Sequence, residues 1–358
     1  MENPAREKRY DILCPTSMGV RITPTDRQSV HTAREYRMQA TSAESNVLAI
    51  GASLGLRTKV LTAFVSGSPI ADFIKRELSF RHIEYEGPEV PQDGPWGARH
   101  QFNIADSGFG LRGPRVWNDR AGEVGRFLSA GDFDLARIFA REGARLLHLS
   151  GLIAAISPDT AGLCLDLARH AKDNGTLVSF DLNHRASFWK GREAALRDRF
   201  TEIARLSDIL IGNEEDFQLA LGLRGPESGG VGLAGKIEAF KGMIDSARQA
   251  FPDVGAFATT LREVVSANEH LWGAILWADG RFHVIEPRPI PVLDRIGGGD
   301  AFVGGLLYGV IRGWTPEKWA QFGWASGALV ASLESDFGCP ADEGQIWDIW
   351  KGNARVKR

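Results

Sequence analysis

Residues 294–305 read Asp-Arg-Ile-Gly-Gly-Gly-Asp-Ala-Phe-Val-Gly-Gly and indicate more about the fold than any other stretch. Three glycines precede Asp300, and an apolar run with small residues at helical spacing follows it. Because glycine has no Cβ, its backbone N–H groups can approach a ligand closely. If a helix starts at about Gly299, those N–H groups are its unpaired first-turn donors, at the positive end of the helix dipole. The pattern therefore predicts an anion site, with Gly297, Gly298 and Gly299 as backbone donors and the Asp300 carboxylate at its mouth.

An anion hole beside a carboxylate suits phosphoryl transfer to a hydroxyl group. The acid would take the proton of the hydroxyl, while the backbone donors stabilise charge on the moving phosphoryl group. The alternative is a glycine-rich turn in which Asp300 only starts the helix.

The stretch resembles the C-terminal signature of the ribokinase (PfkB-type) sugar kinases, Asp-x-x-Gly-Ala-Gly-Asp-Ala/Ser-Phe. Gly298 stands at the Ala position of that signature, and Asp294 matches its first acid. The resemblance implies one ribokinase-like α/β domain over residues 1–358, with a mainly parallel central sheet and a small β-sheet lid. It also implies ATP and Mg²⁺ as cofactors and leaves room for a monovalent cation. Asp294 would belong to the cofactor region, where we expect it to order the loop.

The composition fits a globular protein outside membranes. The chain has 358 residues, 43% apolar and 24% charged, with a formal net charge of −3. This charge gives no reason to expect a nucleic-acid or membrane partner. The three isolated cysteines, Cys14, Cys164 and Cys339, do not suggest a disulfide framework. The polar start of the chain does not resemble a signal peptide, and no apolar run reaches the ~18 residues of a membrane span, so we expect a cytoplasmic protein.

Strand and helix patterns alternate through most of the chain. A helix is predicted over 43–54 and a buried strand over 57–66. From residue 134 onward a helix at 134–142 is followed by strands that alternate with further helices, at 145–150, 177–181, 208–212 and 255–261. Such alternation predicts a mainly parallel sheet with helices on both faces, which binds ligands at the carboxyl ends of its strands. Two segments, about 17–40 and 96–120, would together form the lid.

Polar residues follow the predicted strand at 177–181. Asp181 ends this strand, and Asn183 and Arg185 follow at alternate positions. A guanidinium there could hold a carboxylate or phosphate, although a salt-bridged loop is the plainer alternative. With Trp189, the segment resembles the Phe-Asp-x-Asn-x-Arg…Trp stretch of 2-keto-3-deoxygluconate kinases. In that branch the arginine belongs to the substrate site, so the resemblance implies substrate contacts for Asp181, Asn183 and Arg185.

Two later strand ends resemble nucleotide-binding parts of the family. Asn213 and Asp216 match its Asn-x-x-Glu motif, which serves Mg²⁺ and the nucleotide phosphates mostly through water. Aspartate replaces glutamate here, so Asp216 would act on the metal indirectly. The Thr-Leu-Arg-Glu run, with Thr260 and Arg262, resembles the end of a strand and a following loop that touch the nucleotide.

The remaining substrate candidates come from three regions. Asn46 matches the asparagine of the family's Gly-Gly-Ala-Glu-Ala-Asn stretch, but Thr41 and Ser42 replace both glycines. These two side chains could bond the substrate or narrow the pocket. On the predicted lid, Gln101 and Asn103 stand where the keto-deoxygluconate branch often has Tyr-x-Arg, unless they form an exposed strand face. Asp336 falls near the position of an acid that lines the sugar site in the same branch.

The sequence thus predicts ATP-dependent phosphorylation of a primary hydroxyl of a sugar acid, such as 2-keto-3-deoxygluconate or a close relative. One alternative is a kinase of a neutral sugar. Another is a weakly catalytic sugar-binding regulator, favoured by the replaced glycines, by Asp216 and by the missing Tyr-x-Arg. Because lid edges commonly pair between subunits in this family, the resemblance also implies a homodimer or a higher homo-oligomer.

Overall fold

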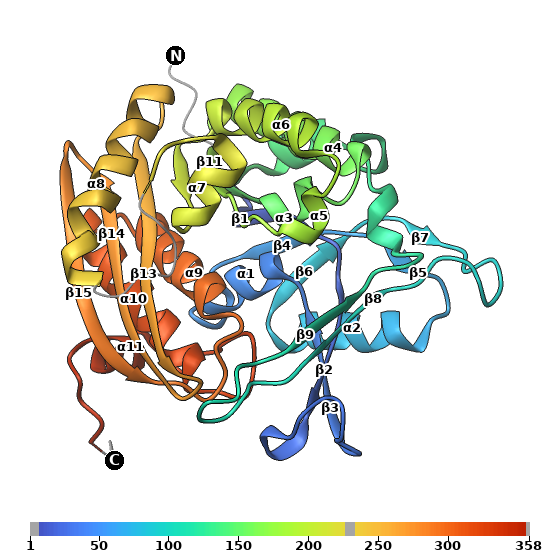
Figure 1. Ribbon diagram of the computed structural model, residues 1–358. Helices are drawn as coiled ribbons and strands as arrows, with labels where there is room; N and C mark the ends of the chain where they lie inside the picture. Colours follow the sequence, from blue (N-terminus) through green and yellow to red (C-terminus); the bar gives the residue numbers. More distant parts are fainter. Residues whose placement is uncertain (1–6, 226–232, 356–358) are drawn as a thin grey trace.

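The computed structural model of the protein describes residues 7–225 and 233–355. Its body is built on a nine-stranded sheet (Figure 1). Neighbouring strands from β13 to β6 run parallel, whereas β14 is antiparallel to both of its neighbours, β13 and β15. The strands, in sheet order, are β15 (Arg281–Pro291), β14 (Glu269–Ala278), β13 (Ala256–Ser266), β12 (Ile209–Ile211), β11 (Leu177–Asp181), β10 (Ala144–Ser150), β1 (Tyr10–Pro15), β4 (Thr58–Leu61) and β6 (Ile83–Glu86).

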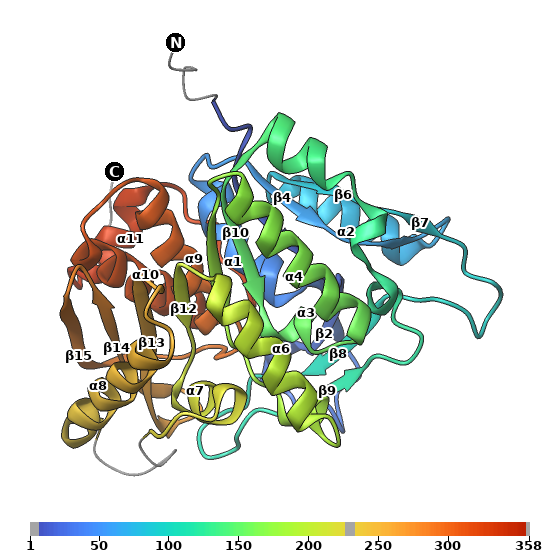
Figure 2. The same ribbon diagram turned by 90° about the horizontal axis from the view of Figure 1, so that it is seen from above.

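Helices cover both faces of this sheet. One apolar core joins it to α4 (Pro158–Asp173), α6 (Glu193–Leu206), α7 (Glu214–Leu221) and α8 (Leu233–Ala250). A second core joins it to α1 (Ala43–Ser53), α2 (Pro69–Phe80), α9 (Gly298–Ile311), α10 (Pro316–Ala331) and α11 (Glu343–Trp350). Figure 2 shows α4 and α6 side by side across one face. The predicted three-layer α/β/α fold is confirmed.

A separate four-stranded sheet forms from the two segments that the sequence assigned to a lid. Its order is β3 (Tyr36–Thr41), β2 (Gly19–Pro24), β8 (Gln101–Ala105) and β9 (Val116–Asp119), and we call it the lid. It projects below the body in Figure 1. Arg21 on β2 lies opposite Gln39 on β3 and Asn103 on β8. Because residues paired across strands share a face, these three side chains lie on one face, which we call the inner face.

Short elements complete the described chain. They are the two-stranded sheet of β5 (Phe64–Val65) and β7 (Glu89–Val90), the helices α3 (Gly151–Ala154) and α5 (Ala186–Trp189), three 3₁₀ turns (Thr25–Arg27, Val124–Phe127, Ala130–Asp132) and the π-helical segment Ala136–Glu142. In the described part of the chain, no helix is both long and apolar enough to cross a bilayer.

Four details differ from the sequence prediction. The strand at 57–66 is interrupted, because the chain leaves the main sheet after Leu61 and its next segment pairs with β7. The helix at 134–142 is π-helical, since Gly143 N–H bonds the carbonyl of Ile138, five residues earlier. Strand β13 continues to Ser266, so Arg262 lies on a strand and not in a loop. Helix α9 begins one residue before the expected Gly299.

Candidate active site

The glycine triplet forms the start of α9, and its three members differ in their surroundings. Gly297 caps the helix with φ of 84°, a left-handed conformation that favours glycine. A Cβ atom at Gly297 would also lie 1.8 Å from the carbonyl oxygen of Asp336, so no other residue fits there. Gly299 has open space around its missing Cβ. No side chain among the described residues caps α9, so its first-turn N–H groups remain available to an anion.

Asp300 sits in the first turn of α9 and contacts the first long helix. The Nδ2 atom of Asn46, on α1, donates a hydrogen bond of 3.0 Å to Oδ2 of Asp300. The close approach of the two helices depends on Gly304, where a Cβ atom would lie 2.3 Å from the carbonyl oxygen of Val47. Packing of α1 against α9 therefore holds the amide of Asn46 next to the carboxylate.

The surroundings of Asp300 adjust its acidity. Burial raises the pKa of Asp300 to about 7, while the hydrogen bond from Asn46 and the positive charge of Arg185 act in the opposite direction. A carboxylate with a pKa close to neutral pH accepts a proton more readily than an ordinary aspartate. Asp300 therefore has the chemistry expected of a general base.

Two further acids lie near Asp300. Asp181 ends β11, and its pKa is raised well above the ordinary range by burial and then by the negative charges of Asp216 and Asp300. The backbone N–H groups of His184 (2.9 Å) and Asn213 (2.8 Å) donate to the two oxygens of Asp216. The side chain of Asn213 in turn accepts from the N–H of Asp216, which makes a reciprocal cap at the start of α7. Asp216 thus joins the loop after β11 to α7.

This acid cluster fits an indirectly held cation. The described residues include no group of three or more His, Cys, Asp or Glu side chains arranged to ligate a metal ion directly. Both oxygens of Asp216 accept backbone hydrogen bonds, and its indirect contact with Mg²⁺ through water stays a prediction. Burial raises the pKa of Asp216 to about 6, and a cation nearby would favour the ionised forms of these acids.

Three arginines lie within electrostatic reach of one another, and Arg185 among them acts on the acids. Arg185 is exposed, starts α5 and acts electrostatically on Asp181, Asp216 and Asp300. Burial, and then the positive charges of Arg295 and Arg185, lower the pKa of Arg262. This arginine lies on β13 opposite Trp272. The sequence analysis missed Arg295, although it stands within the quoted stretch, directly after Asp294. Strand β13 also carries Thr260, which is half-buried.

Four of the predicted substrate residues share one property. Each has a buried side-chain amide oxygen without a hydrogen-bond partner among the described residues. Asn183 follows β11 with φ of 36°, Asn46 lies on α1, and Gln101 and Asn103 belong to the lid strand β8. Since leaving a buried acceptor unpaired costs about 1–3 kcal/mol, such oxygens suit a ligand that supplies hydroxyl groups.

Ser42 and Asp336 are bonded within the protein. Ser42 caps α1, where its hydroxyl accepts from the N–H of Ser45 at 3.0 Å. Asp336 is buried, and its two carboxylate oxygens accept hydrogen bonds from Thr41 and from Gln39, the latter at 2.7 Å. The residues that replace the glycine pair therefore bond the protein itself. Contacts of Ser42 and Asp336 with a substrate stay predictions.

Asp294 is paired with an arginine that the sequence analysis missed. Nη2 of Arg21, on the inner face of the lid, bonds Oδ2 of Asp294, and both side chains are buried. The other carboxylate oxygen accepts the N–H of Ile296 at 3.0 Å. These bonds join Asp294 to the lid and to the loop before Gly297, and its role in ordering that loop stays a prediction. An arginine in an alternating strand pattern would usually be taken as exposed, which is why Arg21 escaped notice.

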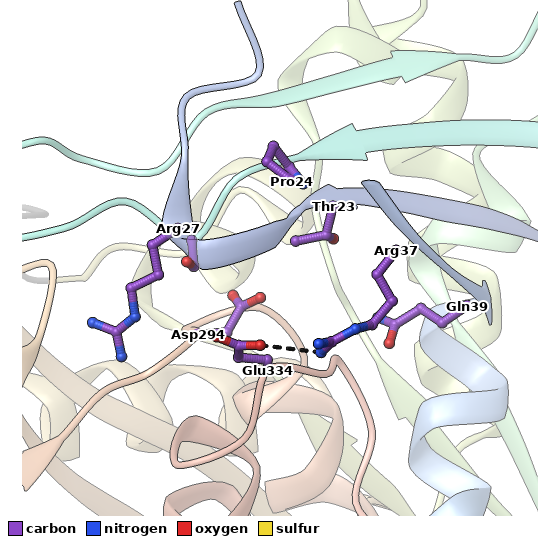
Figure 3. Close-up of a pocket in the computed structure, with 8 residues that line it drawn as sticks. Thr23, Pro24, Arg27, Arg37, Gln39, Asp294 and Glu334 are labelled. Carbon is purple, nitrogen blue, oxygen red and sulfur yellow. Dashed lines mark hydrogen bonds and ion pairs between the residues drawn. The ribbon is translucent and has the colours of Figure 1, made fainter. Parts of the chain in front are cut away.

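A small pocket lies beside this pair, between the lid and the C-terminal part of the body (Figure 3). Arg37 of the lid faces Glu334 across it, with their charged groups 3.1 Å apart. Its lining residues are Thr23, Pro24, Arg27, Arg37, Gln39, Ser107, Asp294 and Glu334. Asp300 does not line it, so this pocket is separate from the anion hole.

Comparison with known proteins agrees with this geometry. The model of the pfkB family carbohydrate kinases matches residues 140–340, more than half of the chain. The chain belongs to this family. This match confirms the family that the sequence predicted.

The individual relatives share about a quarter of their aligned residues with this chain. A 5-dehydro-2-deoxygluconokinase of Clostridium perfringens is 27% identical over 195 residues, which cover 54% of this chain and 51% of the relative. The chain thus spans about half the length of the first such relatives. A 2-dehydro-3-deoxygalactonokinase of Haloferax volcanii is 27% identical over 88% of this chain and 89% of its own. The solved structure of a 2-dehydro-3-deoxygluconokinase from Thermotoga maritima has a TM-score of 0.85 and 25% identity, covering 97% of this chain and 100% of that one.

Proposed function

We propose that the protein transfers the γ-phosphoryl group of ATP to a primary hydroxyl of a sugar acid. One observation carries the transfer chemistry: Asp300, whose pKa burial raises to about 7, sits at the uncapped start of α9. A base and an anion hole then occupy one helix turn. A protein that only binds sugar would not need this combination.

Each residue of the site has its own role in the proposed reaction. Asp300 accepts the proton of the attacking hydroxyl, and Asn46 holds the carboxylate in place through its 3.0 Å hydrogen bond. The N–H groups of 297–300 stabilise the charge of the transferred group. Asn213 and Asp216 face the nucleotide side, and Thr260, Arg262 and Arg295 support the phosphates. Asp216 would hold Mg²⁺ through water, and the ion would supply positive charge to the phosphates.

The proposed substrate class rests on charge and on the relatives. Arg185 supplies an exposed guanidinium near Asp300, which suits the carboxylate of a sugar acid. Asn46, Asn183, Gln101 and Asn103 offer their unpaired oxygens to the hydroxyl groups. All three relatives named above are described as kinases of dehydro-deoxy sugar acids. We therefore infer a keto-deoxy sugar acid such as 2-keto-3-deoxygluconate.

A kinase of a neutral sugar is the second candidate. The four unpaired amide oxygens favour it, because they accept hydrogen bonds from hydroxyl groups and do not attract a carboxylate. In that case Arg185 would serve the nucleotide phosphates.

We further propose that the protein forms a homodimer through the outer face of the lid. Ile22, Met38, Ile104 and Trp117 are paired with one another across the strands, on the face opposite Arg21. Met38 is 44% and Trp117 71% exposed, more than such side chains usually are. Sedimentation of the wild type and of Trp117→Lys tests this proposal: a dimer that the substitution weakens is expected, and a monomeric wild type would refute it.

The deciding experiment measures ADP release with ATP and Mg²⁺ over a panel of substrates. The panel contains 2-keto-3-deoxygluconate, its galacto epimer, aldonic acids, fructose and ribose. Preference for a keto-deoxy acid is expected. Turnover of neutral sugars alone would favour the second candidate, and thermal stabilisation by a sugar without turnover would favour a binding protein. Repeating the assay without Mg²⁺, and with K⁺ replaced by a bulky quaternary ammonium ion, tests the two cations separately.

A further inference from the structure

A buried ion pair joins the lid to the loop that precedes the anion hole. Arg21 is fully buried, and Asp294 is 1% exposed. The carboxylate of Asp294 is shared: one oxygen pairs with the guanidinium from the lid, and the other accepts the N–H of Ile296 within the loop. The lid and the backbone just before Gly297 are therefore held by the same side chain.

A second set of contacts reaches Gly297 from the neighbouring lid strand. Thr41 and Gln39, on β3, bond the two oxygens of Asp336. The backbone carbonyl of Asp336 in turn packs so tightly on Gly297 that a Cβ atom there would lie 1.8 Å from it. Two adjacent lid strands thus contact two acids, of which Asp336 packs on Gly297 and Asp294 bonds the N–H of the residue before it.

The Arg21 contact needs the lid in the position that the structure shows. If the lid moved away, Asp294 would lose the guanidinium that compensates its buried charge, and an uncompensated buried charge is strongly destabilising. The Nε and Nη1 atoms of Arg21 have no partner among the described residues. The bond from Nη2 to Asp294 is therefore the ion pair that the described residues provide for this guanidinium. The pair therefore favours the combination of a seated lid and an ordered loop over either one alone.

We propose that Arg21 is a positioning residue: through Asp294 it couples the seating of the lid to the geometry of the 297–300 anion hole. Thr41 and Gln39 support the same coupling through Asp336. Arg21 itself touches none of the atoms that react. The kinetic part of this inference rests on the proposed function, whereas its structural part does not.

Hydrogen–deuterium exchange of the ligand-free protein tests the structural part. The variant is Arg21→Met, which keeps the length of the side chain and removes its charge. The matched control is Arg37→Met, because Arg37 also joins the lid to the C-terminal part of the body, through an exposed pair with Glu334. We expect amides of 295–300 to exchange at least about tenfold faster in Arg21→Met, the scale of a broken buried pair, and to be unchanged in the control. Unchanged exchange at 295–300, or the same increase in both variants, would overturn the proposal.

The kinetic part is tested by separating binding from turnover. In Arg21→Met we expect kcat to fall at least about tenfold, with the Kd of a fluorescent ATP analogue unchanged and partial recovery in Arg21→Lys. Gln39→Leu provides a second, milder variant with the same expected direction if Arg21→Met folds poorly. Loss of nucleotide affinity together with kcat, without recovery in Arg21→Lys, would mean a general structural role and contradict the coupling. If no sugar in the panel is phosphorylated, the proposed function fails, while the exchange experiment still decides the structural part.

Discussion

The amide of Asn46 donates a hydrogen bond to the carboxylate of Asp300, although the two residues are 254 positions apart in the chain. This bond favours the ionised carboxylate, and burial opposes it by raising the pKa to about 7. The balance sets the pH at which the base becomes available.

We expect Asn46→Ala to move the acid limb of the kcat/KM profile to higher pH. Removing the donor destabilises the ionised form, so the pKa of Asp300 rises and turnover is lost at a higher pH as the solution is acidified. The measurement is kcat/KM between pH 5 and 9. Ser45→Ala is the control, because the Ser45 hydroxyl bonds the carbonyl of Ser42, one turn earlier on the same helix. A limb that stays in place would show that Asn46 does not adjust the base.

Asp300→Asn is expected to bind ATP normally and to lose at least ~100-fold in turnover, the usual scale for a lost general base. The amide keeps the shape of the carboxylate but cannot accept the proton. Single-turnover rates and nucleotide titration separate the two effects. Near-normal turnover in this variant would exclude Asp300 as the base.

Within the glycine triplet, Gly297→Ala should be far more damaging than Gly299→Ala. The first substitution places a Cβ atom against the Asp336 carbonyl oxygen at a positive φ, whereas the second meets open space. Backbone strain of this kind costs about 1–3 kcal/mol, and the clash adds to it. Thermal and denaturant unfolding of the two variants should show the difference in stability. Equal stability would mean that the loop relaxes freely around Gly297.

Arg185→Gln should lower kcat/KM for a sugar acid by about 10–100-fold, the value of a charge-assisted hydrogen bond of about 1.5–3 kcal/mol. The KM for ATP and any activity on neutral sugars should change little. Arg199→Gln is a suitable control, because Arg199 is an exposed arginine on α6 that pairs with Glu202. An equal loss for charged and neutral sugars would assign Arg185 to the nucleotide.

Local sequence was enough to predict most elements and the start of a helix at the glycine triplet. Residues 294–305 can be interpreted from local sequence alone, because the glycines, the acid and the helix start are adjacent. The alternation of strands and helices predicted the layers. Errors occurred where tertiary pairing overrode the local pattern, as at Leu61, where the chain leaves the main sheet to pair elsewhere.

The contacts of the lid could not be predicted in this way. Arg21 occupies an ordinary alternating strand pattern, and its partner Asp294 is 273 positions further along the chain. The bond of Thr41 to Asp336 joins residues 295 positions apart, so local sequence cannot predict it, whereas the bond between Ser42 and the N–H of Ser45 is a local helix cap. Arg295 was overlooked because the glycines beside it explained the motif without it.

The two acids that hold the lid in place have a consequence for the synthesis of the protein. Lid strand β2 emerges from the ribosome early, yet its buried arginine has to wait 273 residues for Asp294, and Thr41 waits 295 residues for Asp336. Contacts of such long sequence separation form late and slow the folding of a chain. A chain that has not yet reached Asp294 therefore carries an unpaired Arg21 on a lid sheet with an apolar outer face, and transiently exposed apolar surface of this kind promotes aggregation. The lid can dock fully only after the segment around Asp336 has been made.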